Sequence, residues 1–403
     1  MIKFLMKVCM LMTIISVIPS VTFSEEASPH EVATFASLFK IRNMKVARNI
    51  VHELKNKYGI KDVTKERVID VLAKKYHTSV EQLQKIEPIR INIGTLAPAN
   101  TPWIKDAIDT VVPFLSWESS GVVNLKIYAG GVMGQDADIL RKMHLGELQG
   151  CGCSAEGFVD AVPELAVLTL PLLFKNYKQV DCVLDGLRED IATRFAQHGY
   201  VLVGLIHAGF FYIFTKNDVT SLDQLKRQKM MTWFGRIETA YLNELGIKPI
   251  PIAVPNVLSS IQTGVINVGT APPIWLLGTQ AFIYLRYYLI PPVFYSPAGI
   301  FIDKKQIDKE DTRFPKGLAD DVVTLMANFI RIYEPEWRDD VESFDEKSMT
   351  VFKGEGLQEI KLDDHDMDTL RVAAEKTKKK LTGEIYSKEL LNKVMQEIKK
   401  CSP

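Results

Sequence analysis

Few residues in this 403-residue chain have the types and spacing that enzyme chemistry requires. The sequence lacks the H-E-x-x-H, G-x-S-x-G and Walker A motifs. Adjacent carboxylates, which acid–base catalysis can use in pairs, occur at Glu189-Asp190, Asp320-Asp321, Asp339-Asp340 and Asp363-Asp364. These pairs stand in polar helical stretches or turns, where a solvated surface explains them better. We therefore predict that the chain is not an enzyme and has no catalytic residue or cofactor.

Two further patterns have a chemical and a structural interpretation. His207, at the end of a predicted strand, is the best single candidate for a general base, but a hydrogen-bonded core histidine is the more frequent case. The run from Gly150 to Ala155 fits G-x-G-x-x-A, a dinucleotide-binding fingerprint. That fingerprint should follow a strand and open a helix, whereas a helix-like segment precedes this one. We interpret it as a closely packed sheet segment.

The cysteines give no metal pattern. Cys151, Cys153, Cys182 and Cys401 follow the N-terminal segment, without C-x-x-C or Cys/His spacing. Cys151 and Cys153 would lie on one face of a strand, which is awkward for a disulfide in regular extended geometry. Export would permit disulfides, but four cysteines are sparse for this length. We predict free, buried thiols and no metal site.

The elements that position any site are clearest in residues 221–275. The pattern predicts a strand at Lys229–Phe234, a helix at Arg236–Leu245, a strand at Lys248–Ile252 and a helix at Pro255–Thr263. Gly246 stands where a helix ends, and Pro255 where a proline begins one. This alternation is typical of βαβ units and a mostly parallel sheet.

The first 24 residues predict a signal peptide. Lys3 and Lys7 precede an apolar run from Val8 to Val17, and Thr22-Phe23-Ser24 is a plausible cleavage site; an uncleaved anchor is the alternative. After cleavage 47 basic residues would face 49 acidic ones, which gives no argument for nucleic acid. No second apolar stretch is long enough to cross a bilayer. We expect an exported, periplasmic protein.

Residues 25–88 differ from the remainder, with 12 Lys and Arg residues against 9 Asp and Glu. Apolar residues recur there at helical spacing, for example Val46, Ile50 and Leu54. We predict a helical N-terminal extension that packs on the main body, and a partner-docking role is the alternative. Residues 89–403 would form the main domain.

Several segments of that domain resemble one family. DQLKRQKMMT, LGIKPIPI and VLSSIQTGVIN, in this order, resemble the core signature of the DctP-type periplasmic solute-binding proteins of TRAP transporters. Pro163-Glu164-Leu165 and the following LTLPLLF resemble another motif of this family. The similarity covers residues 89–400. It implies an α/β, two-lobed periplasmic binding protein fold, with crossing strands, a long helix and a ligand cleft between the lobes.

The family resemblance also implies partners. These would be a small-molecule ligand, a TRAP membrane permease and, by similarity to one subtype, a periplasmic tetratricopeptide-repeat protein.

Two departures from the family pattern bear on the ligand. Met231 stands where the family has the arginine that clamps a carboxylate, and Phe211 stands near a second basic position. An arginine grips a carboxylate with two parallel hydrogen bonds, which neither replacement can make. The segments near the expected cleft are instead aromatic. The predicted ligand-binding residues are Phe210, Phe211, Tyr212, Met231, Trp233, Phe234, Arg236 and Trp275.

We therefore predict a hydrophobic or weakly polar ligand. In one alternative these aromatic residues only fill the lobe interiors. In another, Arg236 replaces the missing arginine as the anchor for a carboxylate.

Overall fold

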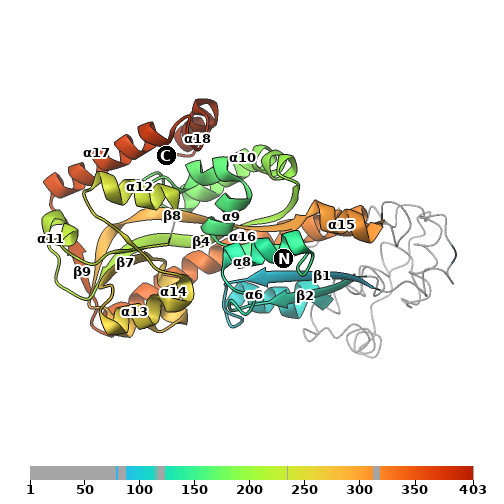
Figure 1. Ribbon diagram of the computed structural model, residues 1–403, viewed down its shortest axis with the longest axis horizontal. Coiled ribbons are helices and arrows are strands. Elements are labelled where there is room, and N and C mark those ends of the chain that lie inside the picture. Colours follow the sequence, from blue (N-terminus) through green and yellow to red (C-terminus); the bar gives the residue numbers. More distant parts are fainter. Residues whose placement is uncertain are drawn as a thin grey trace, which may run out of the picture.

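The computed structural model describes residue 79 and residues 88–113, 115, 123–233, 235–311 and 318–402. The predicted signal peptide and almost all of the predicted helical extension lie outside these residues. Two α/β lobes lie at opposite ends of the long axis and share a pair of long strands that run between them (Figure 1).

The first lobe has three parallel strands. β1 (Ile89–Thr95) lies between β2 (Val123–Tyr128) and β3 (Gly150–Cys153). α6 (Pro102–Asp106) begins with a proline directly after Thr101 and continues as a π-helical turn, Ala107–Val111. α8 (Asp136–Leu145) and α9 (Ala155–Ala161) follow β2 and β3. Leu96, Gly130 and Ser154, just beyond the carboxyl ends of the three strands, lie on the side that faces the second lobe, where α/β folds place their ligand sites.

Two antiparallel strands connect the lobes. β4 (Tyr200–Thr215) and β8 (Tyr287–Asp303) pair along almost their whole length. The local sequence pattern predicts two separate strands, at Tyr200–Ile206 and Phe210–Lys216, but the structure joins them into one. Gly209, which separates them in the sequence, has φ +116° at a bulge and bends the strand without ending it.

The large sheet is mixed, so the prediction of a mostly parallel sheet was wrong. Its order is β2-β1-β3-β8-β4-β7, with β9 (Gln358–Lys361) beside β8, and β3–β8, β8–β4 and β4–β7 are antiparallel. The reason is that β4 and β8 run between the lobes in opposite directions, and each lobe adds its strands to that pair.

The second lobe contains the predicted βα alternation. α11 (Leu222–Lys226), β5 (Met231–Thr232), α12 (Arg236–Glu244), β6 (Ile250–Pro251), α13 (Val257–Thr263), β7 (Val268–Ala271) and α14 (Pro273–Gly278) follow in order. β5 and β6 are parallel, as a βαβ unit requires, although both are shorter than predicted. Gly246 ends α12 in the left-handed conformation, at φ +77°.

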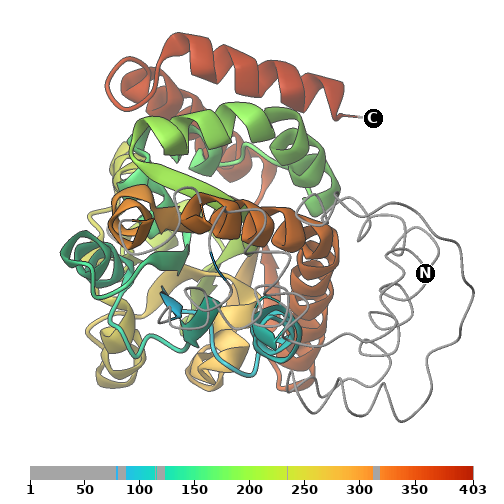
Figure 2. The ribbon, with the colours of Figure 1, turned by 90° about the vertical axis from the view of Figure 1, so that its right-hand side faces the viewer.

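Long helices cover the crossing strands. α10 (Tyr177–Gln197) packs between β4 and α18 (Lys388–Lys400), and α17 (Asp364–Leu381) packs on α12. Figure 2 shows α17 and α18 beyond α10 on one side of the sheet. α15 (Lys304–Asp311) leads towards α16 (Leu318–Gly354), which runs along β4. Among the described residues, no helix has the length and apolarity needed to cross a membrane.

The prediction of free thiols was wrong. Cys182 on α10 and Cys401 after α18 form a disulfide across 219 positions of sequence, with Cα atoms 5.8 Å apart. Cys151 and Cys153 are also paired, with Cα atoms 5.3 Å apart. The first pair was not predicted because its cysteines are far apart in the sequence. The second was not predicted because two residues on one face of a regular strand are poorly placed for a disulfide.

The G-x-G-x-x-A run is a closely packed sheet segment, as interpreted from the sequence. A Cβ on Gly150 would lie 3.0 Å from the carbonyl oxygen of Phe301, and one on Gly152 would lie 3.3 Å from Thr95. These glycines therefore allow β3 to fit between its neighbours.

Candidate functional site

A cavity of about 1070 Å³ lies where the two lobes meet the crossing strands. Thr95, Gln135, Ser154 and Glu156 line it from the first lobe. Trp233, Arg236, Glu238 and Trp275 line it from the second, and His207, Phe211 and Ser296 from the crossing strands. Its volume is of the size that a small molecule needs, and both lobes contribute to its wall.

Three of the predicted residues form an aromatic corner in this wall, namely Phe211, Trp233 and Trp275. The two indole rings meet edge to face, with centroids 5.2 Å apart at 87°. Phe211 approaches Trp233 at 6.3 Å and 81°. Trp233 Nε1 donates to the carbonyl oxygen of Thr270 at 2.6 Å, so its polar atom is already satisfied. The corner thus offers the cavity apolar ring surface.

Other predicted residues lie behind the wall. Phe210 and Met231 are 5% and 2% exposed, and Tyr212 is partly buried among core residues. Met231 belongs to a buried cluster against which Trp233 and Trp275 pack. Hence the structure does not bring Met231 to the cavity, and the two indoles stand there instead. Phe234 lies outside the described residues.

Arg236 lines the cavity at the first position of α12, but it is turned to a partner. Its Nη2 lies 2.8 Å from Glu384 Oε1, and the side chain is 62% exposed. An exposed pair of this kind contributes only about 0–1 kcal/mol. Breaking the Arg236–Glu384 pair therefore costs little free energy, so Arg236 could turn to anchor a carboxylate ligand, as in the alternative above.

Glu156, the second residue of α9, is a wall residue that the sequence analysis missed. No hydrogen bond or ion pair reaches its carboxyl group from the described residues, and its Oε1 is shielded from solvent. Burial raises the pKa of Glu156 to about 8, and the nearby charges of Asp136, Glu238 and Asp160 act in the same direction. Glu156 has no acidic neighbour in the chain, so the pattern of adjacent carboxylates does not identify it.

Glu238, unlike Glu156, has hydrogen-bond partners for its carboxyl group. Its carboxyl group accepts hydrogen bonds from Thr232 Oγ1 at 2.7 Å, from the Trp233 amide at 2.9 Å and from Thr270 Oγ1. Burial nevertheless raises its pKa. These bonds join β5, α12 and β7, so Glu238 supports the aromatic corner from behind.

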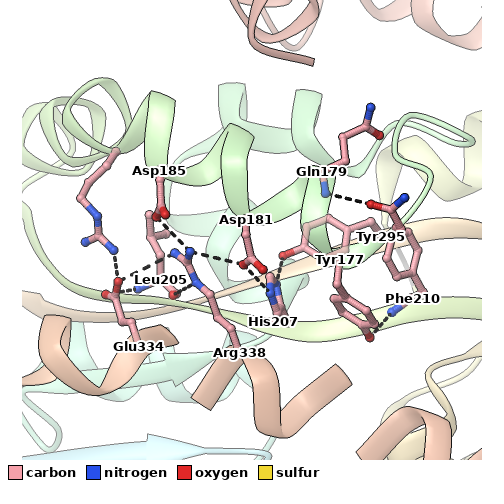
Figure 3. Close-up of polar contacts among 12 residues, drawn as sticks. Tyr177, Gln179, Asp181, Asp185, Leu205, His207, Phe210, Tyr295, Glu334 and Arg338 are labelled. Atoms are coloured by element: carbon pink, nitrogen blue, oxygen red, sulfur yellow. Dashed lines mark hydrogen bonds and ion pairs between the residues drawn. The ribbon is translucent and has the colours of Figure 1, made fainter. Parts of the chain in front are cut away.

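His207 is held by neighbours on two sides (Figure 3). Its Nδ1 lies 2.6 Å from the Tyr295 hydroxyl and its Nε2 lies 3.0 Å from Asp181 Oδ1. Burial lowers the pKa of His207, although the nearby Asp181 carboxylate acts in the opposite direction. The lowered pKa keeps the imidazole neutral near pH 7. The structure thus gives His207 the hydrogen-bonded core position that the sequence analysis favoured.

A bound metal has little support in the one cluster of suitable side chains found in the described part of the chain. Asp136, Cys151 and Cys153 offer ligand atoms within 4.8 Å of one another. The two sulfur atoms are bonded to each other, however, so neither is a thiolate ligand. Asp136 Oδ2 already accepts from Ser154 and Gly157.

Comparison with known proteins assigns the fold. The model of the family "Bacterial extracellular solute-binding protein, family 7" (DctP) matches residues 93–382. A solute-binding protein of Verminephrobacter eiseniae is 26% identical over 224 residues, which are 55% of this chain and 66% of the relative. The C4-dicarboxylate-binding periplasmic protein DctP of Rhodobacter capsulatus is 25% identical over 189 residues, 46% of this chain and 56% of the relative. The chain thus spans less than two thirds of these two relatives.

Solved structures agree on the fold. A sugar acid binding protein from Advenella mimigardefordensis, in complex with galactonate, has a TM-score of 0.70 at 20% identity. The similarity covers 79% of this chain and 100% of that protein. A TRAP periplasmic solute binding protein from Haemophilus influenzae, with bound L-gulonate, has a TM-score of 0.69 at 14% identity. The similarity covers 78% of this chain and 99% of that protein. These similarities confirm the predicted two-lobed binding protein fold for the described domain.

Proposed function

Because the chain belongs to the DctP family of bacterial extracellular solute-binding proteins, we propose that it is the periplasmic receptor of a TRAP-type transporter. It binds a small, hydrophobic or weakly polar ligand in the cavity between its lobes and delivers it to a membrane permease. A periplasmic tetratricopeptide-repeat protein is a proposed additional partner. The family consists of solute-binding proteins and not of enzymes.

The composition of the cavity wall carries this proposal. Among the described residues of the wall, Arg236 is the one arginine or lysine, and it is paired with Glu384. Glu156, Asp160 and Glu238 are acidic. A carboxylate ligand would meet acidic groups there and no unpaired arginine or lysine, and desolvating it without a cationic partner would be costly.

The aromatic corner offers the alternative source of affinity. Apolar burial contributes about 25 cal/mol per Å² of surface removed from water, so a ligand seated against Phe211, Trp233 and Trp275 needs no ion pair. These residues come from a crossing strand, the β5–α12 turn and α14, so the corner also changes shape if the lobes move relative to one another.

A carboxylate ligand anchored by Arg236 is the second candidate. The weakness of the exposed Arg236–Glu384 pair favours it, because the guanidinium needs little free energy to turn. The solved relatives described above hold galactonate and L-gulonate.

Native mass spectrometry of protein purified from a bacterial periplasm distinguishes the two candidates. Spectra under gentle and then denaturing conditions show which small molecule leaves on unfolding. The expected result is an apolar molecule whose occupancy falls in Trp275→Ala. Tyr287→Ala, which removes an aromatic ring outside the cavity wall, is the control and should retain it. A bound organic acid that Arg236→Ala releases would replace the first candidate with the second.

A further inference from the structure

Among the carboxyl groups that line the cavity, Glu156 is the described one with a fully shielded oxygen that has no hydrogen-bond partner. Asp136, in the first lobe but outside the cavity wall, accepts at Oδ2 from Ser154 and from the Gly157 amide, whereas its buried Oδ1 has no partner. Glu238, in the second lobe, accepts three hydrogen bonds. No donor from the described residues reaches Glu156, although one of its oxygens is fully shielded. Polar groups buried in this way are nearly always hydrogen-bonded, and an unpaired one requires an explanation.

The charges around Glu156 indicate which group would pair with it. Three other acidic residues lie close enough to raise its pKa, namely Asp136 on α8, Asp160 on α9 and Glu238 on α12. Arg236, the one described arginine or lysine of the wall, is bound to Glu384. A cation bound there would favour the ionised form of these carboxyl groups and pair with it, whereas an anion would gain no such partner.

The aromatic corner fits the remainder of a cationic ligand. Trp233 and Trp275 line the same cavity, and Trp233 is tied to Glu238 through its amide. With Nε1 of Trp233 bonded to Thr270, the ring offers its face and edge and no free donor. Indole faces attract ammonium groups and also pack against hydrocarbon.

We infer that Glu156 binds the ammonium group of an apolar amine whose hydrocarbon part lies against Trp233 and Trp275. This inference rests on the proposed function, because it specifies the ligand class of the same cavity. The amine is the donor that Glu156 lacks, and the resulting ion pair is sheltered from water.

Binding of the amine is coupled to a proton. Since the pKa of Glu156 is raised to about 8, its carboxyl group is mainly protonated in the free protein at neutral pH. The ammonium group favours the carboxylate, so the proton leaves as the amine binds. Affinity for the amine therefore rises with pH until Glu156 is ionised in the free protein as well.

Three matched probes test the inference by isothermal titration calorimetry on the full mature chain. They are 2-phenylethylamine, 2-phenylethanol and 3-phenylpropanoate, which share a phenyl group and differ in charge. At a pH of about 8.5, the amine should bind about tenfold or more tighter than the alcohol, as for a charge-assisted hydrogen bond. Near pH 7 its binding heat should depend on the buffer, because a proton is released.

Two variants separate the role of Glu156 from general effects. Glu156→Gln should abolish the preference for the amine and the proton release, while the affinity for the alcohol stays the same. Glu147→Gln, an exposed substitution outside the wall, should change neither.

The outcomes also separate the two proposals. If the amine binds no better than the alcohol, or does not bind, the inference is overturned, and binding of the alcohol still supports the apolar receptor. Tightest binding by 3-phenylpropanoate would overturn both.

Discussion

Arg338 on α16 donates its Nε–H to the backbone carbonyl oxygen of Leu205 on β4, across 3.0 Å. One helical turn earlier on α16, Glu334 Oε1 accepts the Leu205 amide at 2.8 Å. β7 pairs with β4 only from Tyr212 onwards, so no strand of the described residues pairs with the second edge of this part of β4. Two side chains of α16 thus satisfy backbone groups that a neighbouring strand would otherwise bind, as Figure 3 shows.

Arg338→Met should therefore destabilise the protein strongly. It leaves the Leu205 carbonyl oxygen without its donor and removes a positive charge from buried Glu334, although Arg188 still pairs with Glu334. Breaking a buried ion pair in this way costs about 3–5 kcal/mol. Urea unfolding at pH 7 measures the loss. Arg371→Met, which breaks an exposed pair with Asp368, is the control and should cost less than about 1 kcal/mol. Equal losses in the two variants would show that α16 does not support this strand edge.

The local elements were predictable where the chain signals its own turns. The helix predicted at Arg236–Leu245 is observed at Arg236–Glu244. The local pattern likewise predicts a helix at Asn176–His198, and one is observed at Tyr177–Gln197. Asn176 caps the latter by accepting the Gln179 amide. Capping and glycine stops act within a few residues, so the sequence displays them directly.

The crossing strands were less predictable because tertiary contacts override their local signals. Pro291 and Pro292 interrupt the local pattern of β8, which by itself predicts a strand only at Ala298–Asp303. In the structure, β8 pairs with β4 on both sides of these prolines, at Leu289 and at Phe294. Long-range pairing decides the length of such strands, and no local window contains it.

The candidate site was predictable only in part, for a similar reason. Phe211, Trp233, Arg236 and Trp275 line the cavity, as their segments suggested. Glu156 could not be identified, because its distinguishing property is the absence of a partner in three dimensions. The position of Met231 likewise depends on which side of the short strand β5 faces the core.

Met231→Arg tests whether the missing arginine could simply be restored. Met231 is buried, and its Cγ lies only 2.6 Å from the position of a Cβ on Gly269. A guanidinium there would lie behind Trp233, without water or a carboxylate partner, so we expect a loss of several kcal/mol. Thermal unfolding measures this loss of stability. Met395→Arg, at an exposed position of α18, is the control and should change stability little. A stable Met231→Arg variant that gains affinity for galactonate would show instead that this position reaches the ligand.

Asp345 should make the stability of the protein depend on pH. It lies on α16, where it accepts hydrogen bonds from Tyr177 and from the Ile274 amide, and burial raises its pKa to about 7. Because its pKa is higher in the folded state than in the unfolded one, its contribution is complete below about pH 4 and is lost as pH rises to about 7. That contribution amounts to about 4 kcal/mol at most, from three pKa units.

Asp345→Asn should remove this dependence, since the amide does not ionise. The measurement is the difference in the free energy of unfolding between variant and wild type at about pH 5 and about pH 8, which cancels the other titrating groups. The variant should be relatively more stable at the higher pH. A difference that does not change with pH would mean that Asp345 titrates alike in both states.

The Cys182–Cys401 disulfide should stabilise the fold by fastening its C-terminal end. It joins α10 to the residue that follows α18, and α18 otherwise depends on contacts such as those of Leu390 and Val394 with the core. A disulfide that closes a loop this long contributes about 2–4 kcal/mol, mainly by restricting the unfolded chain. We expect the double variant Cys182→Ser/Cys401→Ser to unfold at a lower urea concentration by that free energy. Because a reductant also opens Cys151–Cys153, the matched comparison is between reduced wild type and reduced variant, which should unfold at the same urea concentration. If the variant is as stable as oxidised wild type, the packing of α18 alone holds the C-terminal end in place.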